Sequence, residues 1–129
     1  MTENPKALLG MHEPEWKAVY TRRLQRQGYE VLTAQTVDEM KSAMGVSEVG
    51  RPQNPFQLYM MDANLGFPGA DTYDPAKEIF ELIRPDFDSG LIKFLAITGN
   101  PDVVAGATGE GIPCFNKGKS QEITDYLTN

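Results

Sequence analysis

The chain has 129 residues, of which 40% are hydrophobic and 23% charged, and its formal net charge is -6. These values predict a single globular domain over residues 1–129, and the negative charge disfavours direct binding to nucleic acids or anionic membranes. Cys114 is the only cysteine, so an internal disulfide is excluded. No run is long enough to span a membrane, and the polar N-terminus lacks a signal-peptide pattern. We therefore expect a cytoplasmic protein.

The first part of the chain predicts a strand, a helix and a second strand. Ala7-Leu8-Leu9 is an apolar run typical of a short buried strand. Pro14 suits the first turn of a helix, and Gly28 is a natural stop for it. The apolar side chains of this helix recur at helical spacing: Trp16, Val19, Tyr20 and Leu24. The run from Tyr29 to Thr33 then predicts the second strand.

A capping pattern begins the second predicted helix. Thr36-Val37-Asp38-Glu39 places Thr three residues before Glu, the spacing at which each side chain can bind the backbone near the other. The buried stripe of this short helix is expected to comprise Val37, Met40, Ala43 and Met44. Residues 45–55 predict a polar loop rich in Gly and Pro. Phe56–Met61 is the clearest strand of the chain, and Asp62 follows it directly.

The next helix and strand follow a loop over residues 63–73. Asp74-Pro75 has the composition of a helix start, with Asp as the cap and Pro in the first turn. We expect Pro85 to end this helix, because proline lacks the backbone donor that the helix interior needs. Leu91–Ile97 predicts a buried strand that ends at Thr98.

The last part of the chain predicts two helices around a short strand. Asn100-Pro101 again has the composition of a cap and first turn, but Gly106 and Gly109 should weaken the helix that follows. Residues 112–116 predict the last strand. We expect Ser120 to cap a final helix, whose apolar face comprises Ile123, Tyr126 and Leu127.

This order of elements is five strands alternating with five helices. Continuous apolar strands joined by helices predict an α/β fold, a doubly wound parallel sheet covered on both faces. In such sheets ligands bind beyond the carboxyl ends of the strands. The residues that follow the predicted strands are therefore the candidates for chemistry: residues 10–13, Asp62, Thr98 and Lys117.

The residue types at these strand ends suit phosphoryl transfer. The Asp62 carboxylate can attack a phosphoryl group and hold it as an acyl phosphate. Negative charge spreads over the phosphoryl oxygens during transfer, and Lys117 can supply a positive charge while Thr98 supplies a hydroxyl donor. A Mg²⁺ ion held by carboxylates and phosphoryl oxygens would normally complete such a site.

The ordered set of motifs resembles the receiver domains of bacterial two-component response regulators along nearly the whole chain. The supporting segments are Lys6-Ala7-Leu8-Leu9 with Glu13-Pro14, Met60-Met61-Asp62-Ala63-Asn64-Leu65, Ala96-Ile97-Thr98-Gly99 and Phe115-Asn116-Lys117. The resemblance implies a flavodoxin-like sheet of order 2-1-3-4-5 and a non-enzymatic signalling role. It makes Asp62 the phosphoacceptor, Thr98 the switch hydroxyl, Lys117 the phosphoryl-contacting lysine, and the Asn64 backbone carbonyl a metal ligand. The implied partners are a histidine kinase or phosphotransfer protein and a downstream signalling protein.

The acidic pair of the family is replaced in this chain. Receivers carry two acidic residues directly after the first strand, where this chain has Met11 and His12, and we expect both to lie opposite Asp62. Met offers no oxygen ligand and His prefers softer metals than Mg²⁺, so we expect weak Mg²⁺ binding that depends on Asp62 unless Glu13 reaches the site.

Three further positions depart from the family pattern. The loop after Asp62 is two residues longer than usual, with Gly66-Phe67 before Pro68, and Gly118 stands where proline commonly follows the lysine. The position of the aromatic switch residue holds Cys114. Phe115 comes one residue later, and this shift should turn its ring to the opposite face of the sheet.

Three functions remain open on the sequence. Retention of Asp62, Thr98 and Lys117 favours a phosphorylation switch. Substitution at Met11 and His12 favours a degenerate pseudo-receiver that binds partners without phosphorylation. An unrelated enzyme or nucleotide-binding protein is disfavoured, because no P-loop, dinucleotide fingerprint or nucleophile elbow is present.

Overall fold

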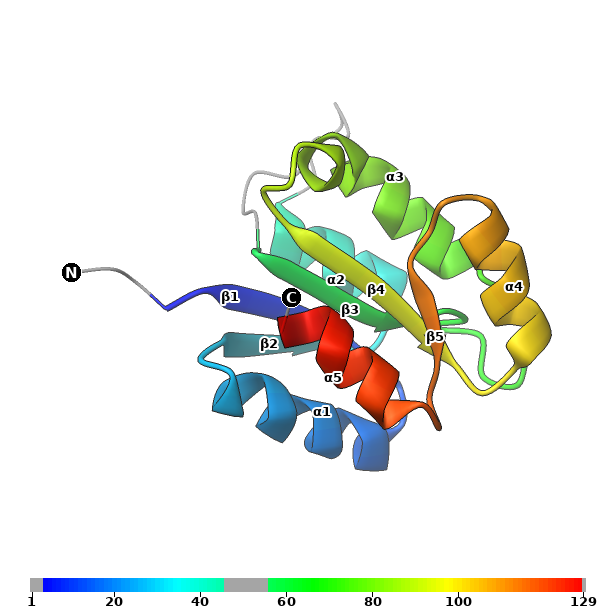
Figure 1. Cartoon of the computed structure of the whole chain (residues 1–129), viewed down its shortest axis with the longest axis horizontal. Helices are drawn as coiled ribbons and strands as arrows, with labels where there is room; N and C mark the ends of the chain where they lie inside the picture. The colour runs from blue at the N-terminus through cyan, green and yellow to red at the C-terminus, as the bar shows by residue number, and fades with distance from the viewer. Residues whose placement is uncertain (1–3, 46–55, 129) are drawn as a thin grey trace.

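The computed structural model describes residues 4–45 and 56–128, so most of the loop predicted at 45–55 lies outside the described residues. Strands and helices alternate strictly along the chain (Figure 1). The strands are β1 (Lys6–Gly10), β2 (Glu30–Ala34), β3 (Leu58–Asp62), β4 (Lys93–Thr98) and β5 (Cys114–Asn116). The helices are α1 (Pro14–Arg26), α2 (Val37–Met44), α3 (Asp74–Asp88), α4 (Pro101–Gly109) and α5 (Ser120–Thr128).

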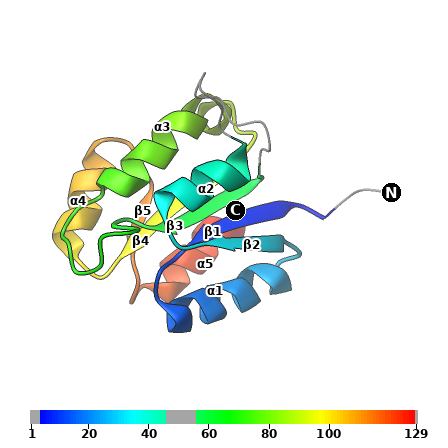
Figure 2. The same ribbon diagram turned by 180° about the vertical axis from the view of Figure 1, so that it is seen from behind.

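The five strands form one parallel sheet in the order β2-β1-β3-β4-β5. Helices α1 and α5 cover one face, and α2, α3 and α4 cover the other (Figures 1 and 2). The predicted flavodoxin-like, doubly wound fold is therefore confirmed. Because all strands run the same way, their carboxyl ends share one edge of the sheet.

Alternation along the strands divides the core between the two faces. In β1, Leu8 packs with the core cluster under α2, α3 and α4, whereas Ala7 and Leu9 pack with the cluster under α1 and α5. All five side chains of the central strand β3 are buried, including the carboxylate of Asp62. The edge strand β2 is more exposed, as shown by Leu32 at 49%.

The capping patterns at Thr36 and Asn100 form as expected. The Thr36 hydroxyl accepts a hydrogen bond from the Glu39 backbone N–H at 3.1 Å, and the Asn100 side chain accepts one from the Asp102 N–H at 2.8 Å. These bonds satisfy backbone donors that the first turn of a helix leaves unpaired. In α2, Met40 and Met44 are buried, as the predicted stripe requires.

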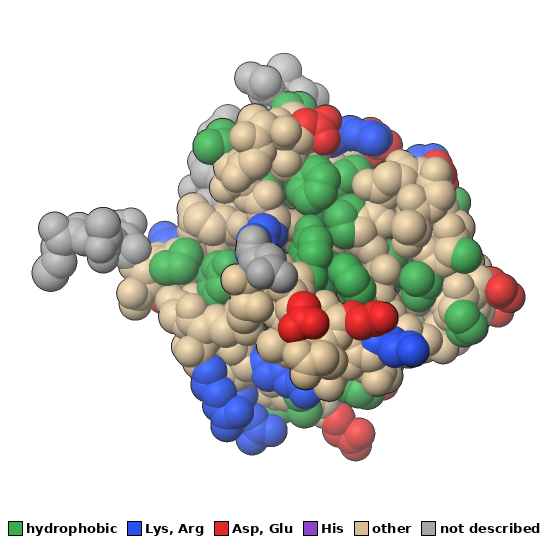
Figure 3. Space-filling model, viewed as in Figure 1, with side chains coloured by type: hydrophobic (Ala, Val, Ile, Leu, Met, Phe, Trp, Pro, Cys, Tyr) green, Lys and Arg blue, Asp and Glu red, His purple; other side chains and the backbone are tan. Residues whose placement is uncertain are grey.

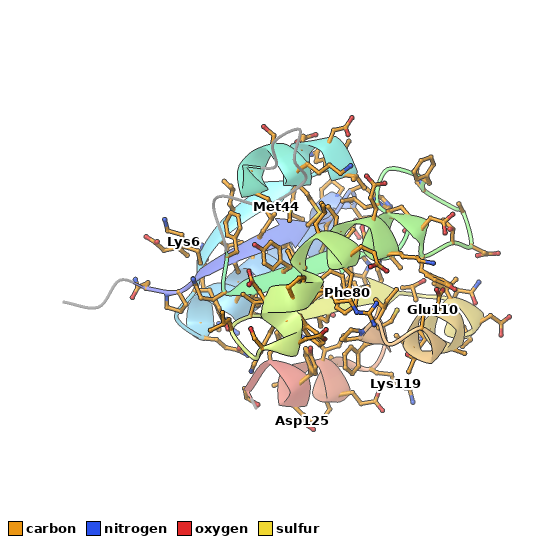
Figure 4. The ribbon with its side chains drawn as sticks, turned by 90° about the horizontal axis from the view of Figure 1, so that it is seen from above. Lys6, Met44, Phe80, Glu110, Lys119 and Asp125 are labelled. Atoms are coloured by element: carbon orange, nitrogen blue, oxygen red, sulfur yellow. The ribbon has the colours of Figure 1, made fainter. Side chains whose placement is uncertain are left out.

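Pro85 does not end α3, and the prediction that it does is wrong. The helix continues to Asp88 with Pro85 inside it. Phe87, in this last part of the helix, packs against Phe80 with ring centroids 5.1 Å apart (Phe80 is labelled in Figure 4). Burial of aromatic surface stabilises the last turn and offsets the missing backbone donor of proline.

Several element ends also differ from the expectations. Asp74 is the first residue of α3 and Tyr73 is its N-cap, while Ser120 is the first residue of α5. The strands near residues 91–97 and 112–116 begin later than predicted, at Lys93 and Cys114. Apolar runs identify a strand but not its ends, because an apolar residue beside a strand can also lie in a loop, as Leu91 does at 71% exposed. Within the described ranges, no helix is long and apolar enough to cross a membrane.

Candidate functional site

Asp62 is the last residue of β3, in the centre of the sheet, and its side chain is only 1% exposed. The backbone holds this position firmly, because the N–H of the next residue, Ala63, donates to the Ile97 carbonyl of β4 at 2.9 Å. A buried carboxylate is costly unless polar or charged groups surround it. The groups that surround Asp62 therefore define the site.

Lys117 provides the positive charge. It follows β5 directly, and its backbone N–H donates to the Thr98 carbonyl at 2.9 Å, which fixes its place beside β4. The Lys117 Nζ lies 3.0 Å from Asp62 Oδ1 and 3.1 Å from Glu13 Oε1. Burial alone lowers the pKa of Lys117, but the attraction of Asp62 and Glu13 outweighs it, so this pKa is raised and the ammonium form is favoured.

His12 contacts the other oxygen of the same carboxylate. Its backbone N–H donates to Asp62 Oδ2 at 3.2 Å, and its imidazole Nδ1 also lies 3.2 Å from Oδ2. The Nε2 atom lies 3.9 Å from Glu13 Oε1. His12, Asp62, Lys117 and Glu13 therefore form a closed four-residue ring in which each side chain contacts the next. The sequence places His12 opposite Asp62 but does not predict these contacts.

Thr98 lies at the end of β4 and is 9% exposed. Its hydroxyl accepts a hydrogen bond from the Asn100 backbone N–H at 3.2 Å. Thr98 lines an open cavity of about 480 Å³ together with His12 and Lys117, so these polar groups face one space. The structure thus brings the three strand-end residues Asp62, Thr98 and Lys117 to the same edge of the sheet.

The long loop after β3 forms another wall of this cavity through Pro68, Gly69, Ala70 and Asp71. The Asn64 side chain donates to the Ala70 carbonyl at 3.1 Å, and the Asn100 side chain donates to Asp71 Oδ1 at 2.8 Å. Gly66 and Gly69 have φ angles of 87° and 83°, which favour glycine because it has no Cβ. Two side-chain bonds and two glycines therefore hold the lengthened loop beside the site.

Met11 does not face the cavity. Its side chain is fully buried in the core cluster under α1 and α5, with Tyr20 and Leu24. The expectation that both degenerate positions face Asp62 is wrong for Met11 and holds only for His12. Met11 follows Leu9 by two residues and packs in the same cluster, because side chains two positions apart in an extended chain share a side.

Two aromatic residues of α1 connect the site to the surface of that helix. The Lys117 Nζ lies 5.8 Å from the centre of the Trp16 ring, and Trp16 stacks on Tyr20 with centroids 5.9 Å apart. The Arg23 guanidinium lies over the other end, 5.3 Å from the Tyr20 centroid. Burial raises the pKa of Tyr20; Arg23 and Lys117 lower it, and Asp62 raises it further. Trp16 could have been found from the sequence, because it lies in the first turn of the helix that begins beside the site.

Cys114 and Phe115 lie on opposite faces of the sheet, as the shifted pattern predicts. Cys114 packs in the cluster under α2, α3 and α4, and Phe115 packs against Tyr126 of α5 with ring centroids 5.1 Å apart. The aromatic ring of β5 therefore lies on the face of the sheet that α5 covers.

The residues around Asp62 are a poor fit for Mg²⁺. No group of three or more His, Cys, Asp and Glu side chains that could hold a metal ion occurs within residues 4–45 and 56–128. Of the other carboxylates that line the cavity, Glu13 contacts Lys117 and Asp71 accepts a hydrogen bond from the Asn100 side chain. The Asn64 carbonyl, which the family resemblance makes a metal ligand, accepts a hydrogen bond from the Phe67 N–H at 2.8 Å. Mg²⁺ requires nearly octahedral oxygen coordination, and these groups do not provide it.

Comparisons with known proteins support the fold. No protein-family model matches the chain, and no curated protein matches it in sequence. Among solved structures, the non-phosphorylated HemR receiver domain from Leptospira biflexa is 20% identical, with a TM-score of 0.64 and coverage of 96% of this chain and 91% of that one. A signal receiver domain of an HD domain-containing protein from Pseudomonas fluorescens Pf-5 is 18% identical, with a TM-score of 0.67 and coverage of 98% and 93%.

A third solved structure carries a metal. The receiver domain of the sensor histidine kinase PA1611 from Pseudomonas aeruginosa PAO1 has a magnesium ion coordinated in its active-site cleft. It is 19% identical, with a TM-score of 0.65 and coverage of 97% of this chain and 95% of that one. These similarities agree with the strand order described above. The chain therefore folds as a receiver-like domain, the fold of response-regulator signalling modules.

Proposed function

We propose that this chain is a receiver domain in phosphorelay signal transduction, with Asp62 as the phosphoacceptor. The observation that carries the proposal is the 3.0 Å contact between Lys117 Nζ and Asp62 Oδ1 at the carboxyl edge of the parallel sheet. The Thr98 hydroxyl and Lys117 line one cavity there. This combination of carboxylate, ammonium and hydroxyl groups suits phosphoryl transfer better than any other arrangement among the described residues.

The transfer assigns a separate task to each group. A carboxylate oxygen of Asp62 forms a bond to phosphorus while the bond from phosphorus to the donor breaks, which leaves an acyl phosphate. The donor is a phosphohistidine of a histidine kinase or phosphotransfer protein. Lys117 holds the charge that develops on the phosphoryl oxygens, and Thr98 donates its hydroxyl hydrogen to one of them. The added charge then changes the contacts around Thr98 and Lys117, and this change is the signal.

The test is incubation with a small phosphodonor, acetyl phosphate or phosphoramidate, followed by mass spectrometry. We expect the mass of the native chain to increase by one phosphoryl group. The mass of Asp62→Asn should not change, because this substitution keeps the size of the side chain but removes the nucleophile. Lys117→Met should be modified more slowly, since the developing charge lacks its counter-ion. Modification at another residue of the Asp62→Asn variant would contradict the assignment.

A second function is favoured by the burial of Asp62. With a side chain 1% exposed and both oxygens in contact with His12 or Lys117, the carboxylate is shielded from a donor. A phosphorylation-independent binding module would keep the fold and bind a partner protein through its surface. Lys and Arg side chains gather over α1 (Figure 3), which offers a basic face in a chain of net charge -6. A folded protein that stays unmodified by both phosphodonors would support this second function over the first.

A further inference from the structure

We propose that His12 occupies the position beside Asp62 that a divalent cation would need, so that the site works without Mg²⁺. The inference rests on the proposed function for its role in phosphoryl transfer, but the exclusion of the metal is a separate property of the site. It follows from three observations on the described residues: the contacts of Asp62 Oδ2, the contacts of the nearby candidate ligands, and the place of Lys117 in the four-residue ring.

The first observation concerns the space at Oδ2. Both the backbone N and the imidazole Nδ1 of His12 lie 3.2 Å from this oxygen. A Mg²⁺ ion binds an oxygen ligand at about 2.0–2.1 Å and keeps several of its water molecules. The ion and its water would have to lie where the imidazole now lies, and an Asp62 side chain that is 1% exposed has no free surface for them.

The second observation concerns the other ligands. Met11, at the first position of the missing acidic pair, is buried in the core and has no oxygen in its side chain. The Glu13 carboxylate contacts Lys117 through Oε1, and the same atom is 3.9 Å from His12 Nε2. The Asn64 carbonyl accepts from Phe67. Each of these three candidate ligands is therefore buried away from the site or bonded within the protein.

The third observation is that an ammonium group already lies beside Asp62. Lys117 Nζ lies between Asp62 Oδ1 at 3.0 Å and Glu13 Oε1 at 3.1 Å, and the Trp16 ring flanks it. Glu13 thus holds the ammonium group in place instead of binding a metal. In phosphoryl transfer, an N–H of His12 and the Lys117 ammonium group are then the donors that face the phosphoryl oxygens, together with Thr98.

The test is a titration of the native chain with Mn²⁺, used as a paramagnetic substitute for Mg²⁺, followed through amide signals in ¹⁵N NMR spectra. The native protein should show no saturable broadening at Asp62 and Ala63. His12→Asp replaces the imidazole with a carboxylate beside Asp62 and should bind Mn²⁺ at least tenfold more tightly. Gln25→Glu adds the same charge on the exposed face of α1 and should behave like the native chain.

Two outcomes would overturn the inference. One is saturable broadening at Asp62 in the native protein, a measurement that needs no variant and so does not depend on how His12→Asp folds. The other is equal Mn²⁺ affinity of the native chain and a folded His12→Asp variant. Mg²⁺ itself should then compete with Mn²⁺ wherever binding is seen, which identifies the site as one for a hard divalent cation.

A phosphodonor assay separates this inference from the proposed function. If Asp62 is modified at the same rate in EDTA as in excess Mg²⁺, both are supported. If the rate in EDTA falls to background, the inference is wrong while Asp62 remains the phosphoacceptor. If no modification occurs under either condition, the phosphoacceptor role fails, and the Mn²⁺ titration still decides whether His12 excludes the metal.

Discussion

Lys117 and Trp16 form a cation–π contact, with the Nζ atom 5.8 Å from the centre of the indole ring. The same ammonium group contacts Asp62, and the same indole ring stacks on Tyr20. The Lys117 side chain, which follows β5, therefore connects the buried carboxylate of Asp62 to helix α1. Because Trp16 is the only tryptophan of the chain, this contact also gives the site a spectroscopic reporter.

Removal of the Lys117 charge should change the fluorescence of Trp16. Lys117→Met keeps most of the length of the side chain but eliminates the positive charge beside the indole, and the local field sets the emission wavelength. The matched control is Lys119→Met, because Lys119 is exposed two residues later (Figure 4). Emission spectra should differ from the native spectrum for the first variant only. Identical spectra for both would contradict the contact.

The ion pair between Asp62 and Lys117 should show strong coupling in a double-mutant cycle. Lys117→Met leaves a buried carboxylate without its cation, and we expect a loss of about 3 kcal/mol, the lower end of the range for buried pairs. The double variant with Asp62→Asn should lose less than Lys117→Met alone, because no unpaired charge remains. Urea denaturation of the four proteins measures the coupling, and additive losses would contradict it.

The same pair predicts a pH dependence. The pKa of Lys117 is raised above its ordinary value of 10.5 because Asp62 and Glu13 outweigh the effect of burial. The stability that the ammonium form contributes is therefore fully present below pH 10.5 and lost as the pH rises through the folded-state pKa. The difference in unfolding free energy between the native chain and Lys117→Met should narrow in this alkaline range. A difference that widens there would contradict the predicted sign.

Cys114 should be unreactive in the folded protein. Burial raises its pKa from 9.0 to about 11, although a backbone hydrogen bond from Phe115 lowers it slightly. The thiolate is the reactive form, so its population is roughly 100-fold lower than in the unfolded chain at neutral pH. Ellman's reagent at pH 8 should react fast with urea-unfolded protein and far more slowly with folded protein. Equal rates would show that Cys114 is accessible.

Two glycines of α4 should respond differently to alanine. A Cβ at Gly109 meets no atom within 4 Å, so Gly109→Ala should stabilise the protein by about 0.5–1 kcal/mol. A Cβ at Gly106 would lie 2.9 Å from Cε1 of Tyr73. The Tyr73 hydroxyl is hydrogen-bonded to Glu110, the residue that follows α4 and is labelled in Figure 4. Gly106→Ala should therefore give no gain or a loss in the unfolding free energy. Equal gains for both would show that Tyr73 moves freely.

Pro85→Ala should stabilise α3. Alanine restores the backbone donor inside a helix that continues to Asp88. The free energy of unfolding should rise by about 2 kcal/mol, because the greater entropy of the unfolded alanine chain offsets part of the gain within the helix. Pro101→Ala is the control, because Pro101 is in the first turn of α4, where no helical partner exists for an N–H group. Thermal unfolding should show a higher midpoint for Pro85→Ala only. A gain from both substitutions would contradict the assignment of the effect to the missing backbone donor of Pro85.

The order of elements and the location of the site could be predicted from the sequence. Apolar runs, the Thr36 cap and the Asn100-Pro101 pair depend on residues a few positions apart, and short-range patterns of this kind are visible in the sequence. A parallel sheet then requires its strand ends to share an edge, so Asp62, Thr98 and Lys117 were expected near one another. That expectation depends only on the parallel arrangement of the strands.

The contacts within the site were decided by the tertiary structure. His12 and Asp62 are 50 positions apart, and Glu13 and Lys117 are 104 apart, so no local pattern relates them. The direction in which the chain leaves β1 turns Met11 into the core and His12 toward Asp62. The packing of Phe87 on Phe80 likewise keeps Pro85 within α3. Local propensities select strands and helices, but the long-range packing of side chains selects which neighbouring residue faces the carboxylate.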